Sequence, residues 1–313
     1  MGEMFKNILV PLDSSELAER TLSYAKTLVP AGGRLILIRV ARDHWHPGIA
    51  AAEQWDVVHG AEAMIAQRTD RLEASLPGVE WHVYCGSPAE GIVKEASVTN
   101  ADLIVMSTHA RSGLDRLVHG SITEQVLRDA KTAVLVVSLR CQRVWPPAPG
   151  DELLVPLDGS ELAEAALQPA IDLAQRFNAT LRLLTVVEPL VQYASSGLYP
   201  PFELQAEAEK AAKCLAAVAD RIERLKVPAV VEVAIGRPQT VIRAVAAREQ
   251  TVGIVMATHS RHGWRRLVLG SVAEAVLQDV TVPMLIVHPE MPAEAPAKAA
   301  VAASQRQWSL AAV

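Results

Sequence analysis

The sequence predicts an α/β protein of two tandem domains, each a flavodoxin-like, Rossmann-like doubly wound fold with a five-stranded parallel sheet and helices on both faces. Three observations predict this fold class. The chain has 313 residues, enough for about two domains of ordinary size. One pattern of residues occurs twice along it. Within each copy, short apolar runs without polar alternation are separated by segments with apolar residues at helical spacing, as in a parallel sheet covered on both faces.

The repeat is visible in three pairs of segments. ILVPLDSSELAE at residue 8 corresponds to LLVPLDGSELAE at residue 153, and GSPAEGIVKEA at residue 86 corresponds to GRPQTVIRAVA at residue 236. Residues 113–129 and 263–279 are identical at 10 of 17 positions. We therefore expect one domain over residues 1–143, a stiff Pro-rich linker over 144–151, a second domain over 152–290 and a disordered Ala-rich tail over 291–313.

The elements of the first half follow from their patterns in order. The strands are apolar runs of strand length, and the helices repeat apolar residues every three or four positions. Ser14 or Ser15 is a suitable N-cap for the first helix, and Pro88 suits the first position of the third. The predicted strands are residues 7–12, 34–40, 81–86, 101–108 and 132–139, and the predicted helices are residues 15–29, 61–76, 88–99 and 121–130. The second half is expected to repeat this order.

The fifth strand of each half is rich in Val, Leu and Ile, over residues 133–137 and 283–287. An apolar strand left open at the edge of a sheet would promote aggregation. We therefore expect the two fifth strands to be covered by pairing between the halves of the same chain. A homodimer and an unknown protein partner stay open.

Composition excludes several classes of protein. The chain has 30 basic and 35 acidic residues, and only 4% of its residues are aromatic, which argues against nucleic-acid binding. No apolar run is long enough to span a bilayer, and the first residues lack the pattern of a signal peptide, so we expect a cytoplasmic protein without membrane contact. The three cysteines are far apart and predict neither a disulfide framework nor a zinc site.

Ligands of doubly wound sheets bind at the carboxyl ends of the strands, which directs attention to the residues after strands one, two and four. Asp13 and Asp158 follow the first strands. Small residues follow the fourth strands, and nine residues later Gly-Ser opens a helix in both halves. Small side chains let a ligand approach the backbone, and the unpaired N–H groups at a helix start attract an anion, so the pattern indicates a phosphate site.

Each of these residues also has a purely structural explanation. Ser121 with Glu124 fits a capping box, which needs no ligand. Asp13 is equally suited to capping the helix that follows it. The joint occurrence of the pattern, twice in one chain, favours the binding interpretation.

Both halves resemble the universal stress protein family over residues 5–140 and 152–289. In its nucleotide-binding members the fingerprint after the fourth strand is Gly-x-x-Gly, nine residues, then Gly-Ser or Gly-Thr. The Gly-Ser is present twice here, whereas small residues other than glycine occupy both earlier glycine positions in each half. The resemblance implies ATP, with or without Mg²⁺, as the cofactor, an adenine contact at the aspartates, and a role in the stress response. It implies these binding residues: Pro11, Asp13, Val40, Ser107, His109, Ala110, Arg111, Gly120, Ser121 and Ile122 in the first half, and Pro156, Asp158, Val186, Ala257, His259, Ser260, Arg261, Gly270, Ser271 and Val272 in the second.

Nothing in the sequence points to a dedicated catalytic site. There is no Walker lysine motif, no dinucleotide Gly-x-Gly-x-x-Gly and no acidic cluster of a phospho-receiver. His109 and His259 are the repeated titratable groups near the expected phosphates, and a hydrogen bond within the turn accounts for them. We expect weak ATP hydrolysis at most, and no metal site formed by the protein alone. The alternative function is a nucleotide-free dimerisation or adaptor module of the same fold.

Overall fold

The computed structural model describes residues 5–13, 15–41, 59–67, 69, 72, 78–108, 121–141, 143, 145–189, 201–258 and 269–289. The first half agrees closely with the predicted element order. Its elements are β1 (Asn7–Pro11), α1 (Glu16–Leu28), β2 (Arg34–Ala41), β3 (Val79–Cys85), α3 (Pro88–Val98), β4 (Leu103–Thr108), α4 (Ser121–Asp129) and β5 (Ala133–Ser138). Residues 59–67 are also helical. The expected tail over 291–313 lies outside the described residues.

The second half repeats this order with one difference. Its elements are β6 (Glu152–Pro156), α5 (Glu161–Glu164), α6 (Leu167–Phe177), β7 (Thr180–Val187), α8 (Pro201–Glu223), β8 (Ala229–Ile235), α9 (Pro238–Ala246), β9 (Thr251–Ala257), α10 (Ser271–Asp279) and β10 (Met284–Val287). Two helices, α5 and α6, stand where the first half has only α1, so the expected single helix was wrong here. Pro169, which aligns with Tyr24, lacks the N–H for a bond to the carbonyl four residues earlier, and its ring crowds that carbonyl. The helix is accordingly interrupted at Ala165 and Ala166.

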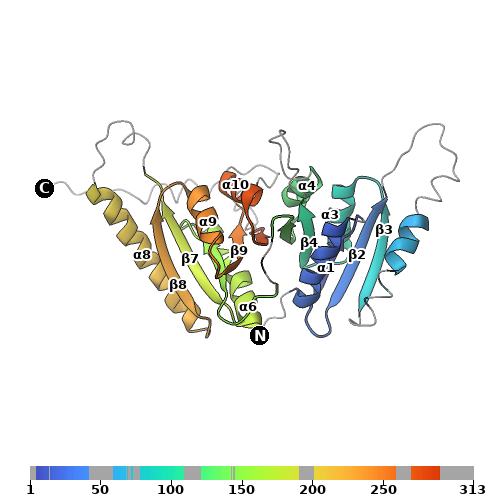
Figure 1. Ribbon diagram of the computed structural model, residues 1–313, viewed down its shortest axis with the longest axis horizontal. Helices are drawn as coiled ribbons and strands as arrows, with labels where there is room; N and C mark the ends of the chain where they lie inside the picture. Colours follow the sequence, from blue (N-terminus) through green and yellow to red (C-terminus); the bar gives the residue numbers. More distant parts are fainter. Residues whose placement is uncertain are drawn as a thin grey trace, which may run out of the picture.

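The ten strands of the described residues belong to one sheet, in the order β3-β2-β1-β4-β5-β10-β9-β6-β7-β8. Within each half the strands are parallel, and the halves meet where β10 pairs antiparallel with β5, with Leu285 opposite Leu135. In Figure 1 the first half lies on the right and the second on the left, with α4 and α10 on either side of the junction. The expected α/β fold of two tandem doubly wound domains is confirmed, as is pairing of the fifth strands.

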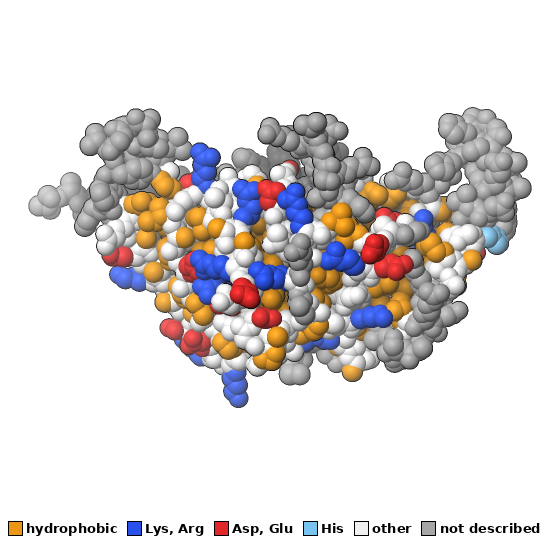
Figure 2. Space-filling model, in the orientation of Figure 1, with side chains coloured by type: hydrophobic (Ala, Val, Ile, Leu, Met, Phe, Trp, Pro, Cys, Tyr) orange, Lys and Arg blue, Asp and Glu red, His pale blue; other side chains and the backbone are white. Residues whose placement is uncertain are grey.

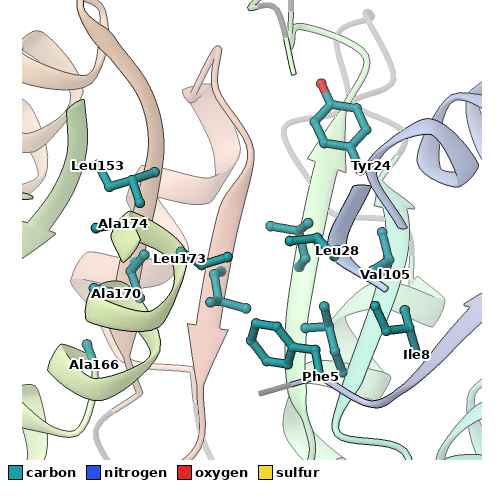
Figure 3. Packing of buried hydrophobic residues seen from close by; sticks show 14 of the residues in the cluster. Phe5, Ile8, Tyr24, Leu28, Val105, Leu153, Ala166, Ala170, Leu173 and Ala174 are labelled. Atoms are coloured by element: carbon teal, nitrogen blue, oxygen red, sulfur yellow. The ribbon is translucent and has the colours of Figure 1, made fainter. Parts of the chain in front are cut away.

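Helices cover both faces of the sheet. On one face α1, α6 and α8 pack against the strands, through Ala25, Ala170 and Leu215 among others. On the other face α3, α4, α9 and α10 form a second buried cluster. Figure 3 shows part of the first cluster, in which Leu28 and Leu173 come from opposite halves. Because inner strands such as β4 and β9 are buried on both faces, they show no polar alternation in the sequence.

The predicted linker packs tightly between the halves. The indole of Trp145 stacks on Tyr24 with 5.2 Å between ring centroids, and Phe177 meets it edge-on at 5.7 Å. Trp145 Nε1 donates a hydrogen bond to Thr27 Oγ1 at 2.7 Å. Arg176 adds bonds from its Nη2 to the carbonyls of Thr27, at 2.7 Å, and Val29, at 2.9 Å. Stacking and hydrogen bonds therefore tie the end of α1 to α6, independently of the sheet.

Basic and acidic side chains lie beside one another on the face drawn in Figure 2. In the second half, Arg182 bridges Glu152 and Glu232 at 2.6 and 2.8 Å, and Arg248 also binds Glu232 at 2.7 Å. Hydrogen bonds from Arg248 and Arg182 hold the pKa of Glu232 below its ordinary value. These charges compensate one another and tie β6, β7 and β8 together. None of the described helices is long and apolar enough to cross a membrane.

The halves fill the space between the third strand and the following helix in opposite ways. Tyr84 on β3 faces Gly91 on α3, whereas the aligned residues of the second half are Ala234 and Val241. A Cβ added at Gly91 would lie 2.4 Å from Tyr84 Cδ1, which is too close for any real contact. The large residue thus stands on the strand in one half and on the helix in the other.

Gly91→Val is therefore expected to destabilise the protein by about 2 kcal/mol, through overpacking against Tyr84. Urea unfolding followed by circular dichroism measures the change. Tyr84→Ala combined with Gly91→Val copies the arrangement of the second half and should recover part of the loss. A double variant no more stable than Gly91→Val alone would show that the two residues are not coupled in this way.

Candidate functional site

The carboxyl ends of β1 and β6 carry the predicted aspartates, both exposed. Asp13 Oδ1 accepts a hydrogen bond from Ser15 N, and Asp158 Oδ1 accepts one from Ser160 N, each at 3.0 Å. The helix caps are the serines, because Ser15 Oγ and Ser160 Oγ accept from the N–H groups three residues on, at 3.1 Å. The aspartates therefore do not cap these helices. Each is held by a local turn at the edge where the sheet would receive a ligand.

Two residues that the sequence analysis missed support these turns. Arg39 Nη1 donates to the Leu12 carbonyl at 3.1 Å, and in the second half Thr185 Oγ1 donates to the Leu157 carbonyl at 2.9 Å. Each stands directly before a predicted contact residue, Val40 or Val186. Because side chains alternate along a strand, Arg39 and Thr185 each lie on the face opposite to the neighbouring valine. This alternation was the only sequence signal that could have identified them. A charged group holds the first turn and a neutral group the second.

The half-buried valines face the other side of the sheet, where they pack against the cluster under α3, α4, α9 and α10. Pro11 and Pro156 are the last residues of β1 and β6 and are also half-buried. Because β1 lies between β2 and β4, with Leu9 paired to Ile104, the carboxyl ends of these three strands are neighbours. The fold thus brings together Asp13, Val40 and Ser107, and in the second half Asp158, Val186 and Ala257.

The small residues at the ends of β4 and β9 lie in regular strand. Ser107 pairs with Val137, and Ala257 pairs with Val287. Neither has a positive φ, so at these positions a residue other than glycine costs no backbone strain. Thr123 Oγ1 donates to the Ser107 carbonyl at 3.1 Å and holds the first turn of α4 against the end of β4.

The start of α10 tests the capping interpretation of the Gly-Ser pair. Gly270 is the N-cap residue, and no side chain makes a hydrogen bond at this cap. Ser271 is the first helical residue and is exposed. The capping box considered for Ser121 and Glu124 therefore has no counterpart at Ser271, and among the described residues no side chain caps the first N–H groups of α10. In the first half α4 likewise begins at the serine, Ser121.

A buried threonine stands at the end of the fourth strand in both halves: Thr108 ends β4, and Thr258 directly follows β9. The two hydroxyl groups differ in their hydrogen bonds. Thr108 is 3% exposed, and its Oγ1 has no hydrogen-bond partner within the described structure. Thr258, also 3% exposed, lies 3.3 Å from His288 Nδ1, with Val287 O at 3.5 Å. Burial lowers the pKa of His288 to about 4, so its ring is neutral at physiological pH. Neither the threonines nor this histidine was singled out from the sequence.

The remaining predicted residues divide into two groups. Ile122 and Val272 are half-buried and pack against the cluster under their own helices. The side chain of Ser121 lies outside the described residues. So do the remaining predicted residues, which are His109, Ala110, Arg111, Gly120, His259, Ser260 and Arg261. Within the described part of the chain, no group of three or more His, Cys, Asp or Glu side chains could hold a metal ion.

Comparison with known families agrees with this architecture. The family described as the universal stress protein family matches the chain twice, over residues 4–138 and 151–288. The chain belongs to the universal stress protein family. Each match ends at a fifth strand, so this universal stress protein carries two complete copies of the family fold joined by residues 139–150.

Relatives include chains of about one such copy and chains of about two. A universal stress protein of Methanocaldococcus jannaschii is 31% identical over 140 residues, which cover 43% of this chain and 82% of the relative. One from Mycolicibacterium smegmatis is 30% identical over 192 residues, which cover 61% of this chain and 63% of the relative. The crystal structure of a universal stress protein from Archaeoglobus fulgidus superposes with a TM-score of 0.68 at 21% identity, over 90% of this chain and 96% of that one. That likeness shows the same two-domain fold.

Proposed function

We propose that this protein binds ATP or another adenine nucleotide and acts in the stress response through nucleotide-dependent conformation and partner binding. The observation that carries the proposal is the start of α10, where no side chain of the described residues caps the helix, at the side of the sheet where the neighbouring strands β9 and β6 end. The helix dipole and these donors favour an anion such as phosphate. Asp158, which follows β6 beside β9, supplies the acceptor that the adenine amino group requires.

In each half a bound nucleotide would reach from the ends of the first two strands to the start of α4 or α10. The aspartate after the first strand accepts from the base, and the valine at the end of the second strand packs against base or ribose. The phosphates lie at the start of α4 or α10, where Ser121 and Ser271 supply hydroxyl groups suited to a phosphate oxygen or to Mg²⁺. Nucleotide binding shifts the chain toward one surface conformation, which a partner recognises through its different affinity for the two states. The proposed role requires no catalytic residue.

Replacement of both aspartates tests the base contact. Asp13→Ala combined with Asp158→Ala is expected to weaken Mg-ATP binding about tenfold, because each site loses a charged acceptor for the adenine amino group. Titration calorimetry measures the affinity, with Glu207→Ala on the exposed surface of α8 as the control. Affinity that is unchanged in the double variant would remove the aspartates from the site.

The adaptor alternative is favoured by exposed apolar side chains on the outer strands. Trp81 on β3 is 37% exposed, and Val230 and Ile235 on β8 are 39% and 51% exposed. An adaptor would use these edges and bind no nucleotide. Mass spectrometry of small molecules released from the denatured purified protein separates the two functions. An adenine nucleotide supports the proposal, whereas its absence, together with no calorimetric heat on adding Mg-ATP, supports the adaptor.

A further inference from the structure

The two candidate sites differ at one buried polar position. Thr108 and Thr258 align in the repeat, and both are almost fully buried. The hydroxyl of Thr258 is within hydrogen-bond reach of His288, whereas the hydroxyl of Thr108 has no partner among the described residues. A buried hydroxyl without a partner destabilises the folded protein, and such groups are rare in native structures.

The difference follows from the residue that ends the fifth strand. His288 aligns with Ser138, which is paired with Thr108 across β4 and β5. Ser138 Oγ bonds to other groups instead: it donates to the Val280 carbonyl of the other half at 3.3 Å, accepts from Arg140 N at 3.2 Å and lies 3.5 Å from Cys141 Sγ. The Ser138 hydroxyl, which could have bonded to Thr108, is therefore engaged at the junction between the two halves.

Thr108 is the last residue of β4 and lies near the first turn of α4. It follows Met106 by two residues and so shares the face on which Met106 packs with Val126 and Leu127 of that helix. The bond from Thr123 Oγ1 to the Ser107 carbonyl brings the first turn of α4 against the residue before Thr108. The hydroxyl of Thr108, which has no partner among the described residues, and the first turn of α4 thus lie at the same end of β4.

We propose that the two sites are not equivalent, and that Thr108 makes the first half the principal nucleotide site by donating its hydroxyl hydrogen to a phosphate oxygen. In the second half His288 takes up the corresponding hydroxyl, which leaves that site with one polar contact fewer. This inference rests on the proposed function, since it assigns the anionic ligand to one of two sites.

Matched valine substitutions test it, because valine replaces the hydroxyl by a methyl group of similar size. Thr108→Val is expected to raise the Kd for Mg-ATP about five- to tenfold, whereas Thr258→Val should leave it unchanged. The same pair should change the thermal stability of the nucleotide-free protein in opposite directions. Thr108→Val removes an unsatisfied polar group and should raise the Tm by about 3 °C, whereas Thr258→Val deprives His288 of its partner and should lower it by about as much.

The outcomes distinguish the inequality of the two sites from nucleotide binding itself. Two sites of equal affinity in the wild-type chain, or equal effects of the two substitutions on the Kd, would overturn the inference and leave nucleotide binding intact. A Tm shift of the same sign in both variants would also overturn it. The absence of any heat with Mg-ATP would overturn the proposed function and this inference together.

Discussion

Trp145→Ala is expected to lower the free energy of unfolding by about 3 kcal/mol, among the largest effects of any single substitution in this protein. The indole stands between Tyr24 of the first half and Phe177 of the second, and its N–H bonds to Thr27. Its removal leaves a cavity that rings from both halves line. Urea unfolding followed by far-UV circular dichroism measures the loss.

Two further variants separate the contributions of Trp145. Trp145→Phe keeps a stacked ring and loses only the hydrogen bond to Thr27, so it should cost about 1 kcal/mol. Val98→Ala, at a position that is 66% exposed at the end of α3, should change stability by about 0.5 kcal/mol or less. A cost for Trp145→Ala no larger than that for Val98→Ala would show that the linker does not hold the halves together.

Acidification is expected to destabilise the protein through His288 by about 3 kcal/mol between pH 7 and pH 4. Burial lowers the pKa of this histidine from 6.5 to about 4 in the folded protein. Above pH 6.5 the ring is neutral in both states. Between pH 6.5 and 4 the unfolded chain binds a proton that the folded protein excludes, so the free energy of unfolding falls as the pH is lowered. Below pH 4 both states are protonated and this contribution no longer changes.

The comparison that isolates this effect is the pH dependence of unfolding in His288→Gln. Carboxylates titrate in the same range in every variant, so the relevant quantity is the difference from the wild-type curve. His288→Gln should lose less stability than wild type on going from pH 7 to pH 4. Parallel curves for wild type and His288→Gln would mean that the folded protein accepts the proton at His288.

The element order and the predicted pairing of the fifth strands could be read from the sequence because both are local or repeated signals. The apolar run ending at Pro11 and the N-cap at Ser15 each depend on a few neighbouring residues. The interruption between α5 and α6 was also readable, since Pro169 alone explains it. An expectation that the second half copies the first hid this signal.

The details of the site depended on contacts between distant residues. The bond from Arg39 to Leu12 crosses two strands, and the contact of His288 with Thr258 joins residues 30 positions apart. Neither leaves a periodic or motif-like trace in one sequence. Packing of Trp145 was missed for the same reason, because a Pro-rich segment resembles a spacer whether or not one of its side chains is buried elsewhere.

Covalent fusion of the two copies has a consequence for how the molecule can change. In a dimer of identical chains, any substitution appears on both sides of the symmetry axis at once. Here β5 and β10 meet across the same antiparallel seam, but their sequences are separate, so Ser138 and His288 can differ at equivalent places. The opposed pairs Tyr84–Gly91 and Ala234–Val241 are a second instance of this freedom. A single gene thereby allows one copy to specialise while the other preserves the scaffold.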